Sequence, residues 1–469
     1  MSIRVLATAA ILSALPGTVF AADLDGAALA WPWAIPFCGL LLSIAIMPLA
    51  APSLWHHHYG KIALAWALGV ILPFVASFGF ATAFAAIWHT MAAEYIPFLI
   101  LLGALFTIAG GVYVKGNLHG SPKTNTALLA VGTGIASFTG TTGAAMLLIR
   151  PVLRANDERR HNAHVVIFFI FLVANIGGSL TPLGDPPLFL GFLKGVGFFW
   201  PTVHLFLPML TVTAILLVAF YALDSWFYHR DEAFKAKYDP TPDAPLSIEG
   251  KVNILLLGGV VAAVLMSGLW KPGIAWNIAG TVIELQGVAR DVILLALAWL
   301  SLKITPPGCR EANAFSWGPI QEVAKLFFGI FVTIVPVIAM LKAGKDGAFA
   351  GVVAAVTNQD GSPNAAMYFW LTGILSSFLD NAPTYLVFFN TAGGDPATLM
   401  GPLATTLAAI SAGAVFMGAN TYIGNAPNFM VKAVAEENGV KMPSFFGYML
   451  WSIAFLIPCF ILVDLVFFL

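Results

Sequence analysis

The sequence predicts an all-α polytopic membrane protein made of two inverted repeats, with re-entrant hairpins and broken transmembrane helices. The first observation behind this prediction is composition. Of 469 residues, 59% are hydrophobic and only 10% are charged, and the mean hydropathy is +0.87. A soluble domain carries about 25% charged residues, so a soluble protein is excluded. The net charge of −1 gives no indication of nucleic-acid binding. The second observation is a series of apolar segments, and the third is an internal repeat.

Apolar segments of about 20 residues, long enough to cross the hydrocarbon layer of a bilayer, recur along the chain. The expected membrane segments are 33–53, 62–80, 95–114, 125–149, 163–193, 202–223, 252–270, 289–303, 319–341, 365–389, 398–433 and 445–468. The longest polar interval, residues 224–251, is predicted to be a cytoplasmic linker. It separates a first half, residues 23–223, from a second half, residues 252–469.

The N-terminal residues have the layout of a secretory signal. Arg4 precedes the apolar run 5–15, and small residues follow it up to Ala22. We predict that residues 1–22 are a cleaved signal peptide; the alternative is a short anchor helix. A secretory start predicts a bacterial inner-membrane protein whose mature N-terminus is periplasmic.

Basic residues indicate how the chain crosses the membrane. Most of the 22 Lys and Arg residues fall on the cytoplasmic side if 125–149 and 365–389 are re-entrant hairpins. This distribution agrees with the positive-inside rule. If both segments were full spans, the basic residues between Arg150 and Arg160 would move to the opposite side. The charge pattern therefore favours hairpins.

The internal repeat becomes visible when the chain is shifted by 240 residues. The shift places Ser137 on Ser377 and Asp185 on Asn425, without a gap between the two motifs. Other pairs come into register as well: Gly178 with Gly418, Thr181 with Thr421, Gly184 with Gly424, and Pro187 with Pro427. Because the two hairpins are expected to enter from opposite sides, the repeats are predicted to be inverted, as in alternating-access transporters.

Four segments rich in Gly, Pro, Asn and hydroxyl residues interrupt the apolar pattern, at 137–143, 175–187, 376–384 and 418–427. Lipid cannot satisfy free backbone groups, so these segments must be buried in protein or line a wet cavity. Their oxygen atoms are suitable ligands for an ion. The expected cation or proton site comprises Asp185, Asp380, Asn381, Asn175, Asn420 and Asn425. Further ligands of the substrate site, from backbone and hydroxyl groups, are expected from Ser137, Thr139, Thr141, Thr142, Gly178, Thr181, Gly184, Ser377, Thr384, Gly418, Thr421 and Gly424. A Na⁺ site is expected from the same residues.

Asp185 and Asp380 carry the strongest functional signal, because a carboxylate at membrane depth is costly. We expect them to bind a cation or to exchange protons. The alternative is that they cap helices by accepting hydrogen bonds from free backbone N–H groups. Asp185 corresponds to Asn425 and Asp380 to Gly140, so a site asymmetric in charge is predicted. Asp464, close to the last residue, is expected at the membrane interface.

At these interruptions the sequence resembles the ion transporter superfamily. That superfamily includes NhaD-type sodium/proton antiporters, arsenite permeases, citrate carriers and divalent-anion/sodium symporters. Asp-Asn-Ala-Pro at 380–383 resembles the antiporters' hairpin motif, and Asn-Ile-Gly-Gly at 175–178 with Pro-Leu-Gly-Asp at 182–185 resembles their helix break. The resemblance implies a scaffold domain, a transport domain holding both hairpins, elevator-like movement and a homodimer.

One departure from the superfamily pattern and one further resemblance bear on the substrate. Carboxylate carriers of the superfamily have Ser-Asn-Thr at their hairpin tips, whereas this chain has Ser-Phe-Thr at 137–139 and Leu-Asp-Asn at 379–381. Conversely, Asp-Pro-Pro-Leu-Phe at 185–189 resembles a subgroup labelled putative citrate transporters.

The sequence therefore predicts a secondary transporter and not an enzyme. We expect exchange of Na⁺ (or Li⁺) for H⁺, with Na⁺- or H⁺-coupled uptake of citrate or a dicarboxylate as the alternative. A metal-dependent membrane enzyme using His56–His58 is disfavoured because no ligand spacing accompanies these residues. No cofactor and no nucleic acid is expected. The expected partners are the lipid bilayer, a small inorganic cation or a carboxylate, and a second copy of the chain.

Overall fold

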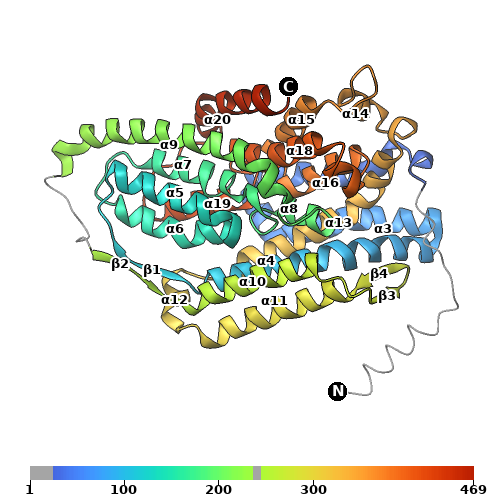
Figure 1. The fold of residues 1–469 in the computed structure, drawn as a ribbon, viewed down its shortest axis with the longest axis horizontal. Helices are drawn as coiled ribbons and strands as arrows, with labels where there is room; N and C mark the ends of the chain where they lie inside the picture. The colour runs from blue at the N-terminus through green and yellow to red at the C-terminus, as the bar shows by residue number, and fades with distance from the viewer. Residues whose placement is uncertain (1–24, 236–243) are drawn as a thin grey trace.

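Figure 1 shows the chain as a computed structural model that describes residues 25–235 and 244–469. The predicted signal peptide, residues 1–22, lies outside the described residues. The first half contains η1 (Gly26–Ala28), η2 (Trp31–Ala34), α2 (Ile35–Ala50), α3 (Pro52–Thr90), η3 (Met91–Tyr95), α4 (Ile96–Ala109), β1 (Tyr113–Asn117), α5 (Pro122–Thr139), α6 (Thr141–Ala155), α7 (Ala163–Leu172), η4 (Ile176–Leu180), α8 (Pro186–Leu193) and α9 (Trp200–Lys235).

The second half contains β2 (Ala244–Glu249), α10 (Val252–Leu269), β3 (Ala275–Ile278), β4 (Thr281–Glu284), α11 (Leu285–Ile304), α12 (Pro307–Ala312), α13 (Gly318–Lys342), η5 (Gly344–Asp346), α14 (Ala350–Ala355), α15 (Ala365–Phe378), α16 (Asn381–Thr391), α17 (Pro396–Met400), α18 (Ala404–Met417), η6 (Gly418–Asn420), α19 (Ala426–Glu437) and α20 (Phe445–Phe467).

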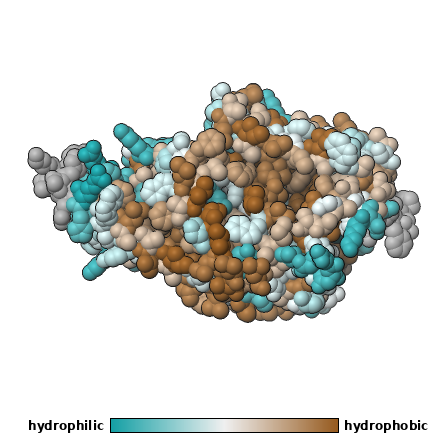
Figure 2. Space-filling model, turned by 90° about the horizontal axis from the view of Figure 1, so that it is seen from above, coloured by the Kyte–Doolittle hydropathy of each residue, from teal (hydrophilic) through white to brown (hydrophobic). Residues whose placement is uncertain are grey.

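The predicted class, an all-α polytopic membrane protein, is confirmed. Within the described residues, seven helices are long and apolar enough to cross a membrane. Hydrophobic side chains gather over the middle of the face in Figure 2, and hydrophilic ones lie mostly towards its ends. The described strands form two short antiparallel pairs, β1 with β2 and β3 with β4. The inverted orientation of the repeats stays a prediction.

The four predicted interruptions are breaks between helices. Hairpin 1 consists of α5 and α6 with a turn at Gly140, whose φ is +77°. Hairpin 2 consists of α15 and α16, separated by Leu379 and Asp380. Broken helix 1 comprises α7, η4 and α8, and broken helix 2 comprises α18, η6 and α19. Each break falls inside one of the apolar segments expected from the sequence.

Two segment boundaries differ from those expected. Residue 224, the predicted start of the linker, lies inside α9, which continues to Lys235. Asp224 is fully buried there, so this part of the interval is not solvated. The predicted segment 62–80 ends at a kink at Gly79 in α3, where φ is +80°, but the chain stays helical beyond it to Ala109.

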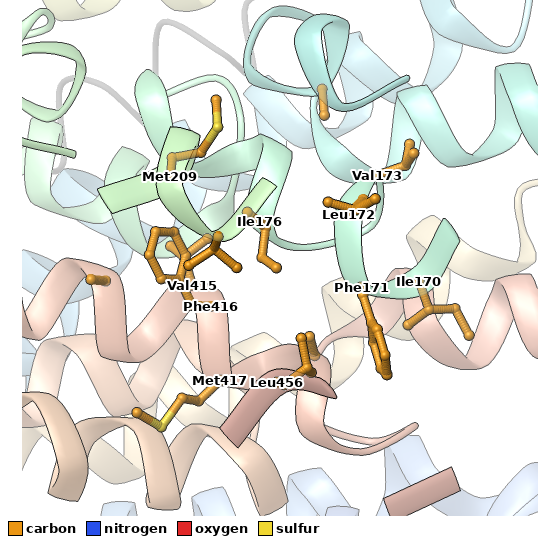
Figure 3. Packing of buried hydrophobic residues seen from close by; sticks show 14 of the residues in the cluster. Ile170, Phe171, Leu172, Val173, Ile176, Met209, Val415, Phe416, Met417 and Leu456 are labelled. Carbon is orange, nitrogen blue, oxygen red and sulfur yellow. The ribbon is translucent and has the colours of Figure 1, made fainter. Parts of the chain in front are cut away.

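Buried hydrophobic residues form two clusters, and each draws on both halves of the chain. The hairpin core contains side chains of both hairpins, both broken helices, α9 and α20. Figure 3 shows part of it, where Phe171 of α7, Met209 of α9, Phe416 of α18 and Leu456 of α20 are labelled. The long-helix core is built mainly from α2, α4, α10 and α13.

The long-helix core also takes in parts of the broken elements. Phe189 and Leu190 of α8 and Leu386 of α16 belong to it. Figure 1 shows α3, α4, α10 and α11 along one side of the molecule, with α9 and α20 on the opposite side. The helices α8 and α16 therefore pack between the two cores.

Candidate functional site

All four interrupted elements meet at the carboxylate of Asp185. Thr141, the first residue of α6, donates its hydroxyl to Asp185 Oδ1 at 2.9 Å. Asn425, at the break of broken helix 2, donates its amide to the same oxygen at 3.1 Å. Asn381, the first residue of α16, donates to Oδ2. Asp185 is 2% exposed, and its three side-chain donors are all neutral.

Local sequence explains why these side chains converge. Pro186 and Pro427 lie in the first helical positions of α8 and α19. Proline is favoured there, and it disfavours a helical conformation in the residue before it. Asp185 is accordingly extended, with φ −144° and ψ 144°, and Asn425 has nearly the same conformation, with φ −150° and ψ 139°. Both side chains thus precede a helix start.

Four helices of eight or more residues begin at this site: α6, α8, α16 and α19. The N-terminal end of a helix carries a partial positive charge, from backbone N–H groups that have no partner within the helix. These ends stabilise the Asp185 carboxylate without a fixed cation. The cluster consequently contains a carboxylate, several amides and a hydroxyl beside the N-terminal ends of four helices.

The hydrogen bonds between each hairpin and its broken helix repeat at the 240-residue shift. Thr181 donates its hydroxyl to the carbonyl oxygen of Ser137, and Thr421 donates likewise to Ser377. The hydroxyl of Ser137 also donates to a carbonyl of broken helix 1 at 2.5 Å, and that of Ser377 donates to the equivalent carbonyl of broken helix 2 at 3.1 Å. The sequence repeat thus corresponds to a repeated set of contacts.

The paired glycines allow two backbone segments to touch. A Cβ atom on Gly184 would lie 2.0 Å from the carbonyl oxygen of Gly178. In the second half, a Cβ atom on Gly424 would lie 2.5 Å from the carbonyl oxygen of Gly418. Since real Cβ atoms do not approach so closely, Gly184 and Gly424 require glycine for packing.

One buried polar residue beside the site, Asn428 of α19, is not among those predicted from the sequence. Its amide nitrogen donates to the carbonyl oxygens of Gly418 and Thr421 at 2.8 and 2.9 Å. The side-chain oxygen of Asn428 accepts a hydrogen bond from the Asn175 amide at 2.7 Å. The side-chain oxygen of Asn175 in turn accepts one from the Asn425 amide at 3.2 Å. A buried Asn in an apolar helix is itself a functional signal, and the repeat-related residue, Leu188, is apolar.

Asp380 caps a helix, which is the alternative role stated above for the two aspartates. Its Oδ1 accepts a hydrogen bond from the backbone N–H of Ala382 at 3.0 Å, and Thr384 donates to its carbonyl oxygen at 3.0 Å. Asp380 therefore fixes the start of α16 and so the position of Asn381.

Two buried amide oxygens near the site, Oδ1 of Asn381 and Oδ1 of Asn420, have no hydrogen-bond partner among the described residues. Asn420 uses its amide nitrogen to donate to Ser377 at 2.9 Å. An amide oxygen that is buried and unpaired is costly, so both atoms are available as ligands for a cation.

Some expected residues lie apart from Asp185. The hydroxyl of Thr139 bonds within its own hairpin, to the carbonyls of Ile135 and Gly140. Thr142 lies in the first turn of α6 and is half-buried. In the part of the chain that the structure describes, no group of three or more His, Cys, Asp and Glu residues could hold a metal ion. His56–His58 lie in the first turns of α3.

Residues 26–468 match the protein family described as putative citrate transport. The chain belongs to this family. It is also similar to an uncharacterized transporter of Mycobacterium bovis and to one of Mycobacterium tuberculosis. Each is 25% identical over 348 residues, which cover 71% of this chain and 73% of the relative. Family membership and the apolar helices identify a multi-pass membrane transporter. The citrate transport family agrees with the subgroup that the motif at 185–189 resembles.

Proposed function

We propose that this transporter exchanges Na⁺ (or Li⁺) for H⁺ across the bacterial inner membrane by alternating access, with elevator-like movement. The observation that carries the proposal is the buried carboxylate of Asp185, to which neutral side chains from three other broken elements donate. A carboxylate with no fixed cation is able to take either a proton or a metal ion. The unpaired oxygens of Asn381 and Asn420 supply further ligands.

Competition between the two ions gives exchange. When Asp185 binds Na⁺, the cation neutralises its negative charge and a proton no longer binds. When Asp185 binds H⁺, the negative charge that holds Na⁺ is lost. Transport of one ion in each direction follows if the carboxylate faces the two sides of the membrane in turn. A periplasmic mature N-terminus and a homodimer remain predictions.

The second candidate function is Na⁺- or H⁺-coupled uptake of citrate or a dicarboxylate. Membership of the citrate transport family favours it. The N-terminal ends of four helices at the site carry a partial positive charge that suits an anion. In this case Asp185 would hold the coupling cation and the carboxylate substrate would bind beside it.

One assay separates the two functions. Everted membrane vesicles holding a pH gradient receive Na⁺, Li⁺, K⁺ or citrate, and the recovery of internal pH is followed. We expect Na⁺ or Li⁺ to dissipate the gradient and Asp185→Asn to reduce this response at least tenfold. Asp380→Ala should weaken the response, since it removes the cap by which Asp380 positions Asn381.

The matched control for Asp380 is Asp395, an exposed residue that caps α17 by accepting from the N–H of Thr398 at 2.8 Å. Asp395→Ala, which removes an exposed cap, should leave the response unchanged. A response to citrate alone would replace the first proposal with the second. A Na⁺ response that persists in a folded Asp185→Asn protein would remove Asp185 from the mechanism.

A further inference from the structure

The repeat extends beyond the ion site to α9 and α20, where it relates two buried acidic residues. At the shift of 240, Leu216 matches Leu456, Phe220 matches Phe460, and Asp224 matches Asp464. Within each helix the three residues are four positions apart, so they lie on one face in successive turns. The four hydrophobic members and Asp224 are 0% exposed, and Asp464 is 9% exposed. Asp464 is thus buried within the protein, and its interfacial depth in the membrane stays a prediction.

In the first half, Asp224 is neutralised by the protein itself. Arg159 Nη1 lies 2.6 Å from Asp224 Oδ1, and His164 Nε2 lies 2.8 Å from the same atom. Asn125 donates to Oδ2 at 3.0 Å. The charged groups of Arg159 and Asp224 are completely buried. Burying a charge in this way is tolerable only because it is paired and hydrogen-bonded.

In the second half, the partners are missing from the equivalent positions. Arg159, His164 and Asn125 correspond to Leu399, Ala404 and Ala365. Asp464 Oδ2 accepts one hydrogen bond, from the indole N–H of Trp370 at 2.9 Å. Among the described residues, Asp464 Oδ1 is buried without a hydrogen-bond partner. A buried carboxylate with an unpaired oxygen is costly unless a cation pairs with it.

A pocket of about 440 Å³ lies at the end of α20, where residues one helical turn after Asp464 line it, although Asp464 itself is not in the wall. The N–H groups of Phe468 and Leu469 both donate to the carbonyl oxygen of Asp464 at 3.0 Å, and both residues line the pocket. Ala365, which replaces Asn125, is in the wall as well. The polar part of the wall consists of Asn358, Ser362, Asn364, Thr405 and Thr406. One water occupies about 30 Å³ in the liquid, so the pocket has room for a small organic molecule.

We propose that Asp464 and this pocket bind a small organic cation bearing a guanidinium or primary ammonium group. The ligand supplies the positive charge that Arg159 and His164 supply to Asp224 in the first half. The polar wall accepts its remaining N–H groups, through the side-chain oxygens of Asn358 and Thr406 among others. Asp464 Oδ1 is covered in the present structure, so binding requires a side-chain movement in the pocket wall. This site is separate from Asp185 and does not depend on which ion is transported.

Thermal unfolding of the purified full chain in detergent tests the proposal. Methylguanidinium chloride or ethylammonium chloride is titrated at constant ionic strength, with NaCl and KCl as references. We expect a saturable rise in the unfolding midpoint with the organic cations and not with the references. The rise should disappear in Asp464→Asn. It should persist in Asp360→Asn, where a fully exposed carboxylate beside Ser362 of the pocket wall is lost.

A second variant keeps the test decisive if Asp464→Asn folds poorly. Ala404→His places an imidazole at the position equivalent to His164, on a residue that is only half-buried. It should raise the unfolding midpoint without ligand and abolish the response to organic cations. An equal response in wild type and either variant would overturn the proposal. Saturable stabilisation by Na⁺ or K⁺ alone would also overturn it, because the site would then hold an inorganic cation.

Discussion

At the level of single residues, the partners of a buried aspartate indicate its role. Asp224 is paired with a buried arginine, so its charge is fixed and it holds α9 against the base of hairpin 1. Among the described residues, Asp185 accepts side-chain hydrogen bonds only from neutral donors, so no protein cation is paired with it. Asp464 has one neutral donor and one unpaired oxygen. The same residue type is thus structural in one place and suited to binding in the other two.

Asn428 provides a prediction at this scale. Asn428→Ala removes the donor to the carbonyls of Gly418 and Thr421 and frees one side of Asn175. Leaving such groups unpaired costs about 1–3 kcal/mol. We expect a lower unfolding midpoint and a several-fold higher KM for the transported cation, because Asn425 loses its support through Asn175. Thermal unfolding and vesicle transport over a range of cation concentrations would measure both.

The matched control is Asn438→Ala at the end of α19. Asn438 is exposed and donates to the carbonyl of Val434 in its own helix at 2.8 Å. We expect no change in KM from this substitution. If Asn428→Ala shifted stability but left KM unchanged, Asn428 would be purely structural.

At the level of elements, each hairpin is fastened to its own broken helix by the same set of contacts. A threonine hydroxyl of the broken helix donates to a serine carbonyl of the hairpin in both halves. The backbones cross so closely at Gly184, beside the carbonyl oxygen of Gly178, that glycine is required there. Each hairpin and its broken helix therefore form one packed unit that holds two of the residues at the ion site.

The prediction at this scale is that Gly184→Ala is strongly destabilising, since the new Cβ would lie 2.0 Å from the carbonyl oxygen of Gly178. Overpacking of this kind typically costs about 1–3 kcal/mol. Gly134→Ala in α5 is the control, because a Cβ there meets nothing within 4 Å. Helix propensity predicts that this control gains up to about 1 kcal/mol. Unfolding midpoints of the two variants should move in opposite directions, and equal midpoints would contradict the close backbone contact.

At the level of the whole molecule, the proposed ion site lies where the two hydrophobic cores meet. The helix α8 begins directly after Asp185 and α16 begins at Asn381, and both then pack into the long-helix core. An ion pair ties the end of broken helix 1 to the long helices: Lys194, after α8, contacts Glu94, which is 4% exposed in the π-helical turn η3. Insertions of this kind in a helix are frequent at functional sites. If broken helix 1 moves against the long helices during transport, this ion pair has to break.

We therefore predict that Glu94→Gln and Lys194→Gln each change the transport rate by roughly threefold to tenfold, which corresponds to about 0.6–1.4 kcal/mol in the barrier. The exchange Glu94→Lys with Lys194→Glu should restore much of the original rate. Initial rates in vesicles at saturating cation would measure the effect.

The control for this prediction is Lys432→Gln. Lys432 pairs with Glu436 at 2.7 Å within α19, so relative movement of the two cores does not break that pair. Its substitution should leave the rate unchanged. Single variants at Glu94 and Lys194 with wild-type rates would show that broken helix 1 does not move against the long helices at this point.

Much of the architecture was predictable because it depends on local composition and on spacing. Apolar segments of membrane length gave the all-α polytopic class, and Gly, Pro and Asn clusters gave the positions of all four breaks. The repeat correctly paired Asp185 with Asn425, although it gave no reason to expect that they touch. Asn428 was missed because its partner in the repeat is Leu188, so the shift that revealed the other site residues concealed this one.

The sequence by itself determined the membrane class, the breaks and the pairing of residues between the halves, because these follow from hydropathy, from proline and glycine geometry, and from residue identity at a fixed shift. Only the tertiary structure decided which aspartate is central. Asp185 and Asp380 both precede a helix start, but one is surrounded by side chains from three other elements and the other caps its own helix. It also decided that Asp224 is paired and Asp464 is not, because a partner distant in sequence is fixed only when the helices pack.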